Sequence, residues 1–409
     1  LLVMAVFFAI NFFCVLFQNE RGELTVTANA WGDYGIHFAL INSFAYTNNF
    51  PPQYPVLYNQ PLGYPFVMDF LSSVLVVGGW TLRDAVIAPN LLYSLAFLVG
   101  VFLLAVALFK KTVIGLLAIL LFFFNGDLGF VYFVRDAISS GNVGLFLQNL
   151  PRAYSHLPDQ GFHFMNLFFS IFLPQRSAIM GFAVSLLVLL LMHRIFEKKA
   201  GKQEFLLAGA LIGLLPLVHG HSFIVVGVAA GFVFLHSFAN KAFEWKKWVW
   251  FIAPAALLGL PQIAWVSQQV SGSFIGLQLG WMAKNSGVGL GELAWFWLKN
   301  WGVVLVLGVI GFVLAPKRVK WFAAPFVFLF FLSNVVRFQP QDWDTIKVLV
   351  YPFLFACFFA ALALSELWEK RKWWPVPQVI VVSLLFLGIF SGVLTLAWWA
   401  GDHPSLYPP

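Results

Sequence analysis

The sequence predicts an all-α membrane protein in which about eleven helices cross the bilayer and shorter helices lie at the outer surface. Hydrophobic residues make up 61% of the chain and charged residues only 10%, whereas soluble domains carry about 25% charged residues. A soluble protein of 409 residues could not bury this much apolar surface. Lipid must therefore be the solvent for most of the chain, and the bilayer is its first partner.

Eleven apolar runs are suited to crossing the bilayer. Several are shorter than the ~20 residues that a straight span needs, so we expect their ends to extend into the polar flanks. A further apolar run, 66–80, would place Lys110 and Lys111 outside if it crossed. We therefore expect it to lie at the outer surface or to dip in and back. The eleven predicted spans are 1–17, 85–109, 112–124, 177–196, 203–218, 221–239, 247–267, 301–316, 319–336, 346–365 and 376–400.

Basic residues indicate which ends of the spans face the cytoplasm. With the N-terminus inside, the inner connections hold 15 of the 24 Lys and Arg residues but only 5 of the 17 acids. This positive-inside bias predicts a multi-pass protein of the plasma (inner) membrane. It also accounts for the net charge of +7 without nucleic acid as a partner. Cys14 and Cys357 lie in apolar runs and are expected to be core residues.

We expect residues 1–409 to form a single transmembrane domain. Leu1 lies inside an apolar run and the C-terminal Ser405–Pro409 stops abruptly. We interpret the chain as a fragment that lacks a few residues in front, and an external soluble domain could be missing behind. No convincing internal repeat is present, which counts against transporters built from two related halves.

The external segments are long, and long loops in a compact protein are usually functional. They are 18–84, 125–176, 268–300 and 337–345. We therefore expect the active site on the external face.

The strongest candidate for chemistry is the polar island Trp31–His37, which follows the first span. Asp33 and His37 are four residues apart, so on a helix they share one face. A carboxylate near a dry interface can take a proton from an acceptor hydroxyl, with His37 as its catalytic partner, or the two side chains could be metal ligands. The alternative is that Asp33 is only a helix cap.

Other external residues are suited to binding an anionic substrate. Arg176 could grip a phosphate in a bidentate way, or it could extend to the lipid headgroups. His219 and His221 could reach a polar pocket, or be satisfied at the interface. Lys347 could neutralise a substrate phosphate with Asp344 orienting it, or the two could form an i, i+3 ion pair at a helix start.

A divalent metal is a further possibility in the segment 125–176. Asp127, Asp136 and His163 are the candidate ligands, because carboxylates and histidines suit a hard-cation or mixed-ligand site. Their spacing matches no recognised zinc pattern, and the alternative is a solvated loop with local turns. No glycine-rich nucleotide loop, nucleophile elbow or HExxH helix is present, which argues against a soluble nucleotide donor bound inside the cell.

The chain resembles the GT-C class of polytopic glycosyltransferases, which includes protein O-mannosyltransferases and the lipid A aminoarabinose transferase. The similarity covers about the first 125 residues and the remaining topology loosely. The family often has two adjacent acids where Tyr34 follows Asp33 here, which leaves the metal requirement and the subfamily open. The residues that carry the resemblance are Gly32-Asp33-Tyr34, Pro61-Leu62-Gly63-Tyr64-Pro65, the run from Arg83 to Asn90, and Phe109-Lys110-Lys111.

The resemblance implies a sugar donor linked to polyprenyl phosphate and presented from the bilayer. It also implies an external-loop Asp as catalytic base, the role that Asp33 matches, and basic residues that hold the lipid phosphate. Arg176, Arg337 and Lys347 are candidates for the phosphate by charge and sidedness. A departing phosphate needs positive charge where negative charge develops. The sugar, the acceptor and the oligomeric state are left open.

Two other classes of function compete with a glycosyltransferase. One is a multi-span transporter or lipid flippase, and the other is a non-catalytic membrane assembly or receptor protein. A transporter should concentrate polar residues near mid-span, whereas here they concentrate in the outer loops. The distribution favours the enzyme.

Overall fold

The computed structural model describes residues 1–27, 29–57, 59–240, 243–269, 276–283, 289–338, 342–370 and 375–401. The chain divides into two compact units. The first comprises Leu1–Gly100 and Ile171–Ser273, and the second comprises Val101–Ser170 and Phe274–His403.

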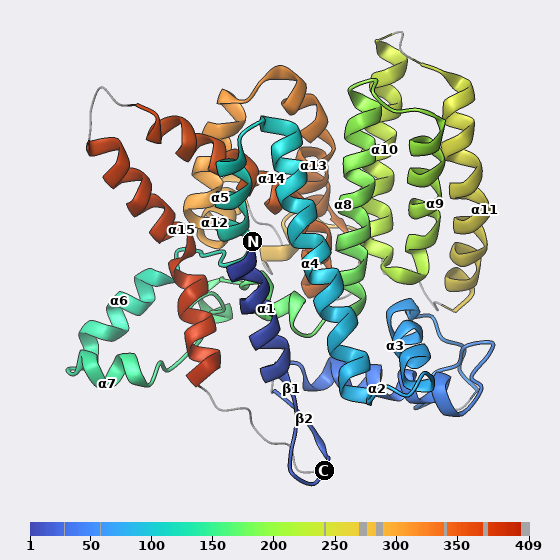
Figure 1. The fold of residues 1–409 in the computed structure, drawn as a ribbon. Helices are drawn as coiled ribbons and strands as arrows, with labels where there is room; N and C mark the ends of the chain where they lie inside the picture. The colour runs from blue at the N-terminus through green and yellow to red at the C-terminus, as the bar shows by residue number, and fades with distance from the viewer. Residues whose placement is uncertain are drawn as a thin grey trace. The chain divides into compact units, whose positions relative to one another are not determined.

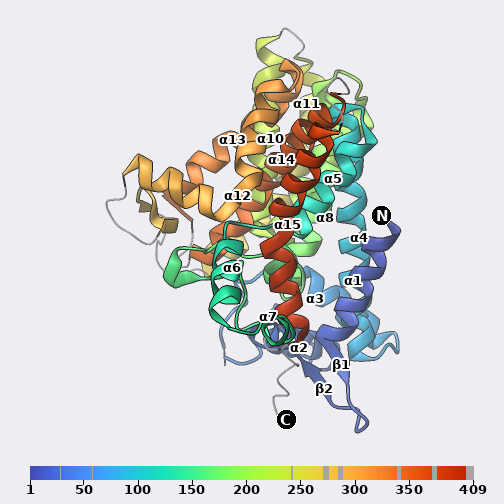
Figure 2. The same ribbon diagram turned by 90° about the vertical axis from the view of Figure 1, so that its left-hand side faces the viewer.

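Helices dominate the first unit. Its only described strand pair is an antiparallel hairpin that follows the first helix directly (Figure 2). The last part of α4 continues into the second unit at Val101. The elements are α1 (Leu2–Val15), β1 (Leu16–Gln18), β2 (Leu24–Val26), α2 (Trp31–Tyr46), α3 (Val67–Val77), α4 (Leu82–Phe109), α8 (Arg176–Phe196), α9 (Lys202–Val218), α10 (Gly220–Ala239) and α11 (Trp245–Gln269).

The second unit is also helical, and its π-helical turn at Phe168–Phe172 continues into the first unit at Ile171. Its described strands pair only with each other, in an antiparallel ladder of two residues each. The elements are α5 (Thr112–Phe123), α6 (Phe130–Ser139), α7 (Val143–Gln148), a 3₁₀ turn (Pro158–Gln160), a π-helical turn (Phe168–Phe172), β3 (Gly276–Leu277), a second 3₁₀ turn (Trp281–Ala283), α12 (Leu290–Leu314), α13 (Lys317–Val335), β4 (Val336–Arg337), α14 (Asp342–Trp368) and α15 (Val376–Gly401).

The predicted all-α membrane class is confirmed. Among the described residues, eight helices are long and apolar enough to cross a membrane: α4, α8 and α10 to α15. Each of the eleven predicted spans coincides with a helix. The remaining three, α1, α5 and α9, have 14, 12 and 17 residues. Their crossing, and with it the count of eleven, stays a prediction.

Four helices of the first unit, α8 to α11, lie side by side and alternate in direction along the chain (Figure 1). Helix α11 exposes apolar side chains such as Leu257 (76%) and Leu260 (62%). In a bilayer these side chains meet lipid, which removes the cost of exposing them to water. Contact with lipid explains why a helix such as α11 can expose apolar side chains that a soluble protein would bury in its core.

Glycines bring α9 and α11 into close contact. A Cβ atom added at Gly209 would lie 2.0 Å from the carbonyl oxygen of Phe251, and one at Gly213 would lie 2.9 Å from the Cβ of Leu258. Small residues allow membrane helices to pack closely. Close packing matters in lipid because there is no hydrophobic driving force between the helices. The side chain of Gln262 adds a polar link by accepting from the N–H of Leu217 (3.1 Å).

We expect Gly209→Ala to destabilise the protein, because the new methyl group would push α9 away from the backbone of α11. Overpacking of this kind costs about 1–3 kcal/mol, measured as a fall in the thermal unfolding midpoint in detergent. Gly231→Ala on α10 is the matched control, since its Cβ would meet nothing within 4 Å. The close contact is not important for stability if both variants unfold at the same temperature.

Helices α2 and α3 pack together at one end of α8 and α9 (Figure 1). Helix α3 has eleven residues, about 16 Å at the usual rise per residue, which is well short of a ~30 Å hydrocarbon core. This agrees with the expectation that 66–80 is not a full span. Leu40 and Phe44 of α2 pack against Leu62 and Phe66, so an apolar cluster fixes the chain between the two helices.

The central helix of the second unit is α14, of which 94% of the apolar span is buried. It packs against α5, α12 and α13. Helix α12 begins at Leu290, eleven residues before the predicted start at 301. A kink at Gly302 (φ 53°) marks the predicted boundary. This agrees with the expectation that short apolar spans extend into their polar flanks, because the added segment contains the charged residues Glu292 and Lys299 and is helical.

Candidate functional site

A buried polar network connects α2, α3, α4 and the start of α8 within the first unit. Each of its main members is at most 1% exposed. Burying this many polar groups is costly unless each one finds a partner. The members are Tyr34, His37, Asp69, Ser72, Asn90 and Arg176.

Arg176 is the hub of this network. Its Nε donates to Oδ1 of Asn90 (3.1 Å) and its Nη2 to Oγ of Ser72 (2.6 Å). Its Nη1 donates to Oδ1 of Asp69. The side chain is fully buried, so the alternative that it extends to lipid headgroups is wrong. Phosphate binding by Arg176 stays a prediction, and in this arrangement its donors are engaged by protein atoms.

Asp69 links this arginine to His37. Its Oδ2 lies 2.8 Å from Nδ1 of His37. The carboxylate of Asp69 accepts this hydrogen bond, so Nδ1 of His37 is the donor. Nε2 is buried and has no hydrogen-bond partner among the described residues. The arrangement of an acid that orients a histidine is one that general-base sites use.

Sequence reasoning did not select Asp69. It lies in the apolar run 66–80, where a single acid is easily read as part of a surface helix. A lone carboxylate in such a run is itself a functional signal, because burying it is expensive. Its partners His37 and Arg176 are 32 and 107 residues away, so no local pattern could have named them.

Asp33 stands in the first turn of α2 and is half-buried. The N-cap residue is Ala30 and no side chain caps the helix, so the interpretation of Asp33 as the cap is wrong. Instead Oδ1 of Asp33 accepts from Nε2 of Gln175 (2.7 Å). Asp33 and His37 lie on the same helix, as predicted. Gln175 directly precedes Arg176, so the hydrogen bond to Gln175 connects Asp33 to the buried network.

Tyr34 closes the group between α2 and α4. Its hydroxyl accepts from Nδ2 of Asn90 (3.2 Å) and donates to the carbonyl oxygen of Leu173 (3.3 Å). Burial raises the pKa of Tyr34 to about 12. Tyr34 therefore remains a neutral donor at physiological pH and holds α2 against the chain that enters α8.

The two histidines at the turn between α9 and α10 also belong to the first unit. Nδ1 of His219 lies 2.7 Å from Oγ of Ser222, and its ring packs edge-on against Phe182. The ring of His221 lies 5.3 Å from that of His219. Gly181 allows this packing, because a Cβ there would lie 2.3 Å from the Cβ of His219. Substrate binding by either histidine stays a prediction.

The remaining candidate anion-binding residues belong to the second unit. Lys347 Nζ lies 2.8 Å from Oδ1 of Asp344, so the i, i+3 ion pair is confirmed. Arg337 lies on β4, paired in register with Gly276. Its Nε is buried without a hydrogen-bond partner among the described residues, which exclude 339–341 of the same segment. Phosphate binding by Arg337 or Lys347 stays a prediction.

The three candidate metal ligands have other contacts. Oδ2 of Asp136 receives hydrogen bonds from Arg152 Nη2 (2.6 Å) and from the hydroxyl of Tyr154 (2.9 Å). His163 stacks on Phe296. Within the described part of the chain, no group of three His, Cys, Asp or Glu side chains is placed to hold a metal ion. A metal requirement stays a prediction.

Asp127 is buried in the connection between α5 and α6. Its Oδ1 accepts from the backbone N–H of Gly129 (2.8 Å), whereas Oδ2 has no partner among the described residues. Burial raises the pKa of Asp127 to about 8. A carboxyl group in this setting is protonated at neutral pH.

We expect this carboxyl group to make stability depend on pH. Its pKa is higher in the folded than in the unfolded chain, so its contribution is greatest below the ordinary value of 3.8 and is lost as the pH rises towards about 8. Asp127→Asn keeps a neutral side chain of the same shape and should flatten the dependence of the unfolding midpoint on pH over that range. An unchanged pH profile in the variant would contradict the raised pKa.

The geometry leaves one connected polar site in the first unit, which joins Asp33, His37 and Arg176 through Gln175 and Asp69. The other candidate residues are not part of this network: His219 and His221 lie at the turn between α9 and α10, and the rest belong to the second unit. A scan against models of known protein families finds no match, and no curated protein matches the chain, so the function is inferred from the chemistry of this site.

Proposed function

We propose that the chain is a membrane glycosyltransferase that moves a sugar from a polyprenyl-phosphate-linked donor to an acceptor, with Asp33 as the general base. The observation that carries the proposal is the position of Asp33. It is a half-buried carboxylate fixed by Gln175 on top of a fully buried network. Supporting residues of this kind hold a reacting group in a defined geometry.

The proposed reaction uses the accessible part of Asp33. The acceptor hydroxyl attacks the anomeric carbon of the sugar and a new C–O bond forms. The bond from that carbon to the phosphate oxygen breaks, and the phosphate leaves with the electron pair. Asp33 takes the hydroxyl proton. His37 is orientated by Asp69 and supports the same helix face one turn deeper.

The leaving phosphate needs compensation by positive charge. Asp69 balances the charge of Arg176, so the carboxylate reduces the net positive charge that Arg176 could offer to the phosphate. Arg337 and Lys347 remain the other candidates for the lipid phosphate. The residues at hand supply acid–base and electrostatic chemistry, and the proposal uses no step that requires a metal.

A direct test uses purified protein and two classes of radiolabelled donor. We expect transfer of sugar from polyprenyl-phosphate sugars to added lipid, polysaccharide or protein acceptors, and no transfer from nucleotide sugars. We expect this because the site lies at the end of membrane helices, where a donor held in the bilayer can reach it. Transfer from the nucleotide sugar alone would refute the donor class, and no transfer from any donor would refute the enzyme.

Sidedness is part of the proposal. In the first unit, the turn between α8 and α9 and the start of α11 carry the lysines, including Lys199 and Lys247, whereas the opposite end carries Asp33 and Asp84. By the positive-inside rule, this distribution supports an external position for the polar site.

We expect a cysteine at position 60 to be labelled from outside intact cells, and one at position 199 to be protected. Both Gln60 and Lys199 are exposed, so accessibility to water is matched. The background chain carries alanine at Cys14 and Cys357. Labelling at 199 with protection at 60 would reverse the orientation.

Proton-coupled transport is the second candidate, and the buried His37–Asp69 pair favours it. Buried ionisable side chains in membrane proteins often belong to proton relays, and this pair is buried where α2 and α3 pack together. A transporter should acidify or alkalinise proteoliposomes when its solute is supplied. Proton movement without sugar transfer would select this alternative.

A further inference from the structure

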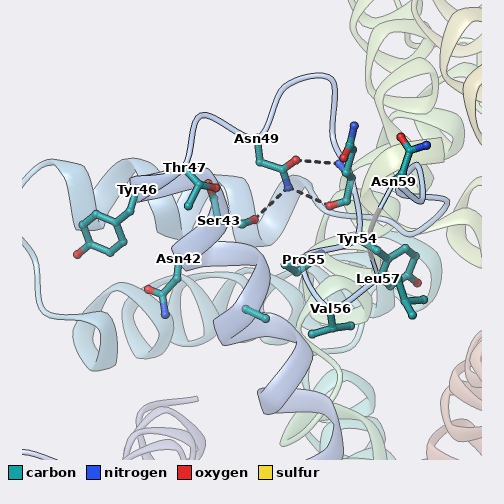
Figure 3. Close-up of a pocket in the computed structure, with 12 residues that line it drawn as sticks. Asn42, Ser43, Tyr46, Thr47, Asn49, Tyr54, Pro55, Val56, Leu57 and Asn59 are labelled. Carbon is teal, nitrogen blue, oxygen red and sulfur yellow. Dashed lines mark hydrogen bonds between the residues drawn. The ribbon is translucent and has the colours of Figure 1, made fainter.

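An open pocket of about 840 Å³ lies on the first unit, between the C-terminal half of α2 and the loop after it. Helix α2 contributes Ala39, Asn42, Ser43 and Tyr46. These positions recur at intervals of three and four residues, so they form one face of the helix. The other wall comes from the loop after α2, through Thr47, Asn49, residues 53–57 and Asn59 (Figure 3).

The pocket is distinct from the site around Asp33. Nine residues separate Asp33 from Asn42, which is two and a half turns at about 3.6 residues per turn. Asn42 therefore points away from the side of α2 that carries Asp33 and His37. The same nine residues place the two side chains about 13 Å apart along the helix axis.

The pocket is built from a segment without charge. Between His37 and Asp69 the chain contains no Asp, Glu, Lys, Arg or His. A phosphate or carboxylate ligand would need a cation here, and a basic ligand would need an acid. The segment that forms the pocket therefore favours an uncharged ligand.

Side-chain amides supply its polar character. Asn42, Gln53 and Asn59 are all exposed. The amides of Asn42 and Asn59 make no hydrogen bond within the described residues. A side-chain amide offers both donors and acceptors, which matches hydroxyl groups because they also donate and accept. Tyr46, which is 72% exposed, adds an aromatic face and a hydroxyl at the rim.

Hydrogen bonds within the loop and to α2 hold the loop wall in place. Nδ2 of Asn49 donates to Oγ of Ser43 (3.1 Å) and to the carbonyl oxygen of Gln53 (2.9 Å), and Oδ1 accepts from the N–H of Gln53 (3.0 Å) (Figure 3). The N–H of Tyr54 donates to the carbonyl oxygen of Gln60 (2.8 Å). With its backbone paired internally, the loop is a poor edge for an added peptide strand. A preformed wall also lowers the entropic cost of binding.

We propose that this pocket binds a neutral oligosaccharide through the amides of Asn42 and Asn59 and the ring of Tyr46. Hydroxyl groups would pair with the amides, and the apolar face of a sugar ring would cover the tyrosine. The inference goes beyond the proposed sugar transfer and does not depend on it, because the pocket lies on another face of α2 from Asp33.

Calorimetry on the full chain in lipid nanodiscs tests the proposal. The probes are neutral linear oligosaccharides of glucose, mannose, galactose and N-acetylglucosamine, a sulfated oligosaccharide, and an uncharged peptide of matched length. At least one neutral oligosaccharide should bind. Asn42→Ala and Tyr46→Ala should each weaken its binding about three- to tenfold, the value of one hydrogen bond or ring contact.

Two matched variants separate this site from the proposed catalytic one. Gln60→Ala changes an exposed amide that does not line the pocket and should bind like the wild type. Asp33→Asn should also bind normally, even if it abolishes sugar transfer. The proposal is overturned if no neutral oligosaccharide binds, if the sulfated sugar or the peptide binds best, or if the Asn42 and Tyr46 variants bind unchanged while remaining folded.

Discussion

Asp33→Asn is expected to slow sugar transfer by about 10²–10⁴-fold, the usual value of a general base. Asparagine has nearly the shape of aspartate, and its carbonyl oxygen can still accept from Nε2 of Gln175, as Oδ1 of Asp33 does. What it loses is the ability to take a proton. The variant should therefore fold, keep its unfolding midpoint and bind the lipid-linked donor. Transfer rates on purified protein with a saturating donor measure the effect.

The matched control is Asp84→Asn. Asp84 is also an acid in the first turn of a helix, α4, but it is exposed and paired locally with Thr81. The Asp84→Asn variant should transfer sugar at the wild-type rate. Equal turnover by Asp33→Asn and the wild type would show that Asp33 is not the general base. A loss of both activity and folding would instead make it a structural residue.

Arg176→Met is expected to lower the free energy of unfolding by about 3–5 kcal/mol, because it leaves the carboxylate of Asp69 buried without its cation. Ser72 and Asn90 would lose a donor at the same time. The measurement is thermal or denaturant unfolding in detergent. Arg21→Met, on an exposed arginine, should have little effect.

A second substitution distinguishes lost charge pairing from lost packing. Asp69→Asn alone leaves Arg176 without its counter-charge, and we expect it to be destabilising. Combined with Arg176→Met, it removes the unpaired charge, so the double variant should be more stable than the sum of the single effects predicts. Strict additivity would mean that the two side chains contribute independently, and the ion pair would not be the reason for their burial.

Most of the fold could be predicted from the sequence because apolar length is a local property. The runs 85–109, 177–196 and 376–400 became α4, α8 and α15 with shifts of a few residues. Apolar runs alone do not give the exact end of a helix that continues through polar residues, although the extension itself was expected. The kink at Gly302 separates such a polar first part of α12 from its apolar remainder.

The candidate site could be predicted only in part. Asp33 and His37 are close in sequence, so their spacing on one helix face was visible. The contacts of Arg176 with Asp69, Ser72 and Asn90 join segments at least 86 residues apart. A single sequence carries no record of such pairings, because they are set by how the helices pack. Arg176 is buried because of this helix packing, and the residues next to it in the sequence did not indicate that burial.

The position of Arg176 at the first residue of α8 has a consequence for the way the chain is assembled during synthesis. A helix start carries partial positive charge, so an arginine there is disfavoured on its own. Asp69 is made 107 residues earlier, and its carboxylate has no cation to accompany it until Arg176 emerges. Burying that carboxylate alone would be costly. Helix α3 should therefore stay in contact with water until α8 arrives, and the two helices should then leave water together.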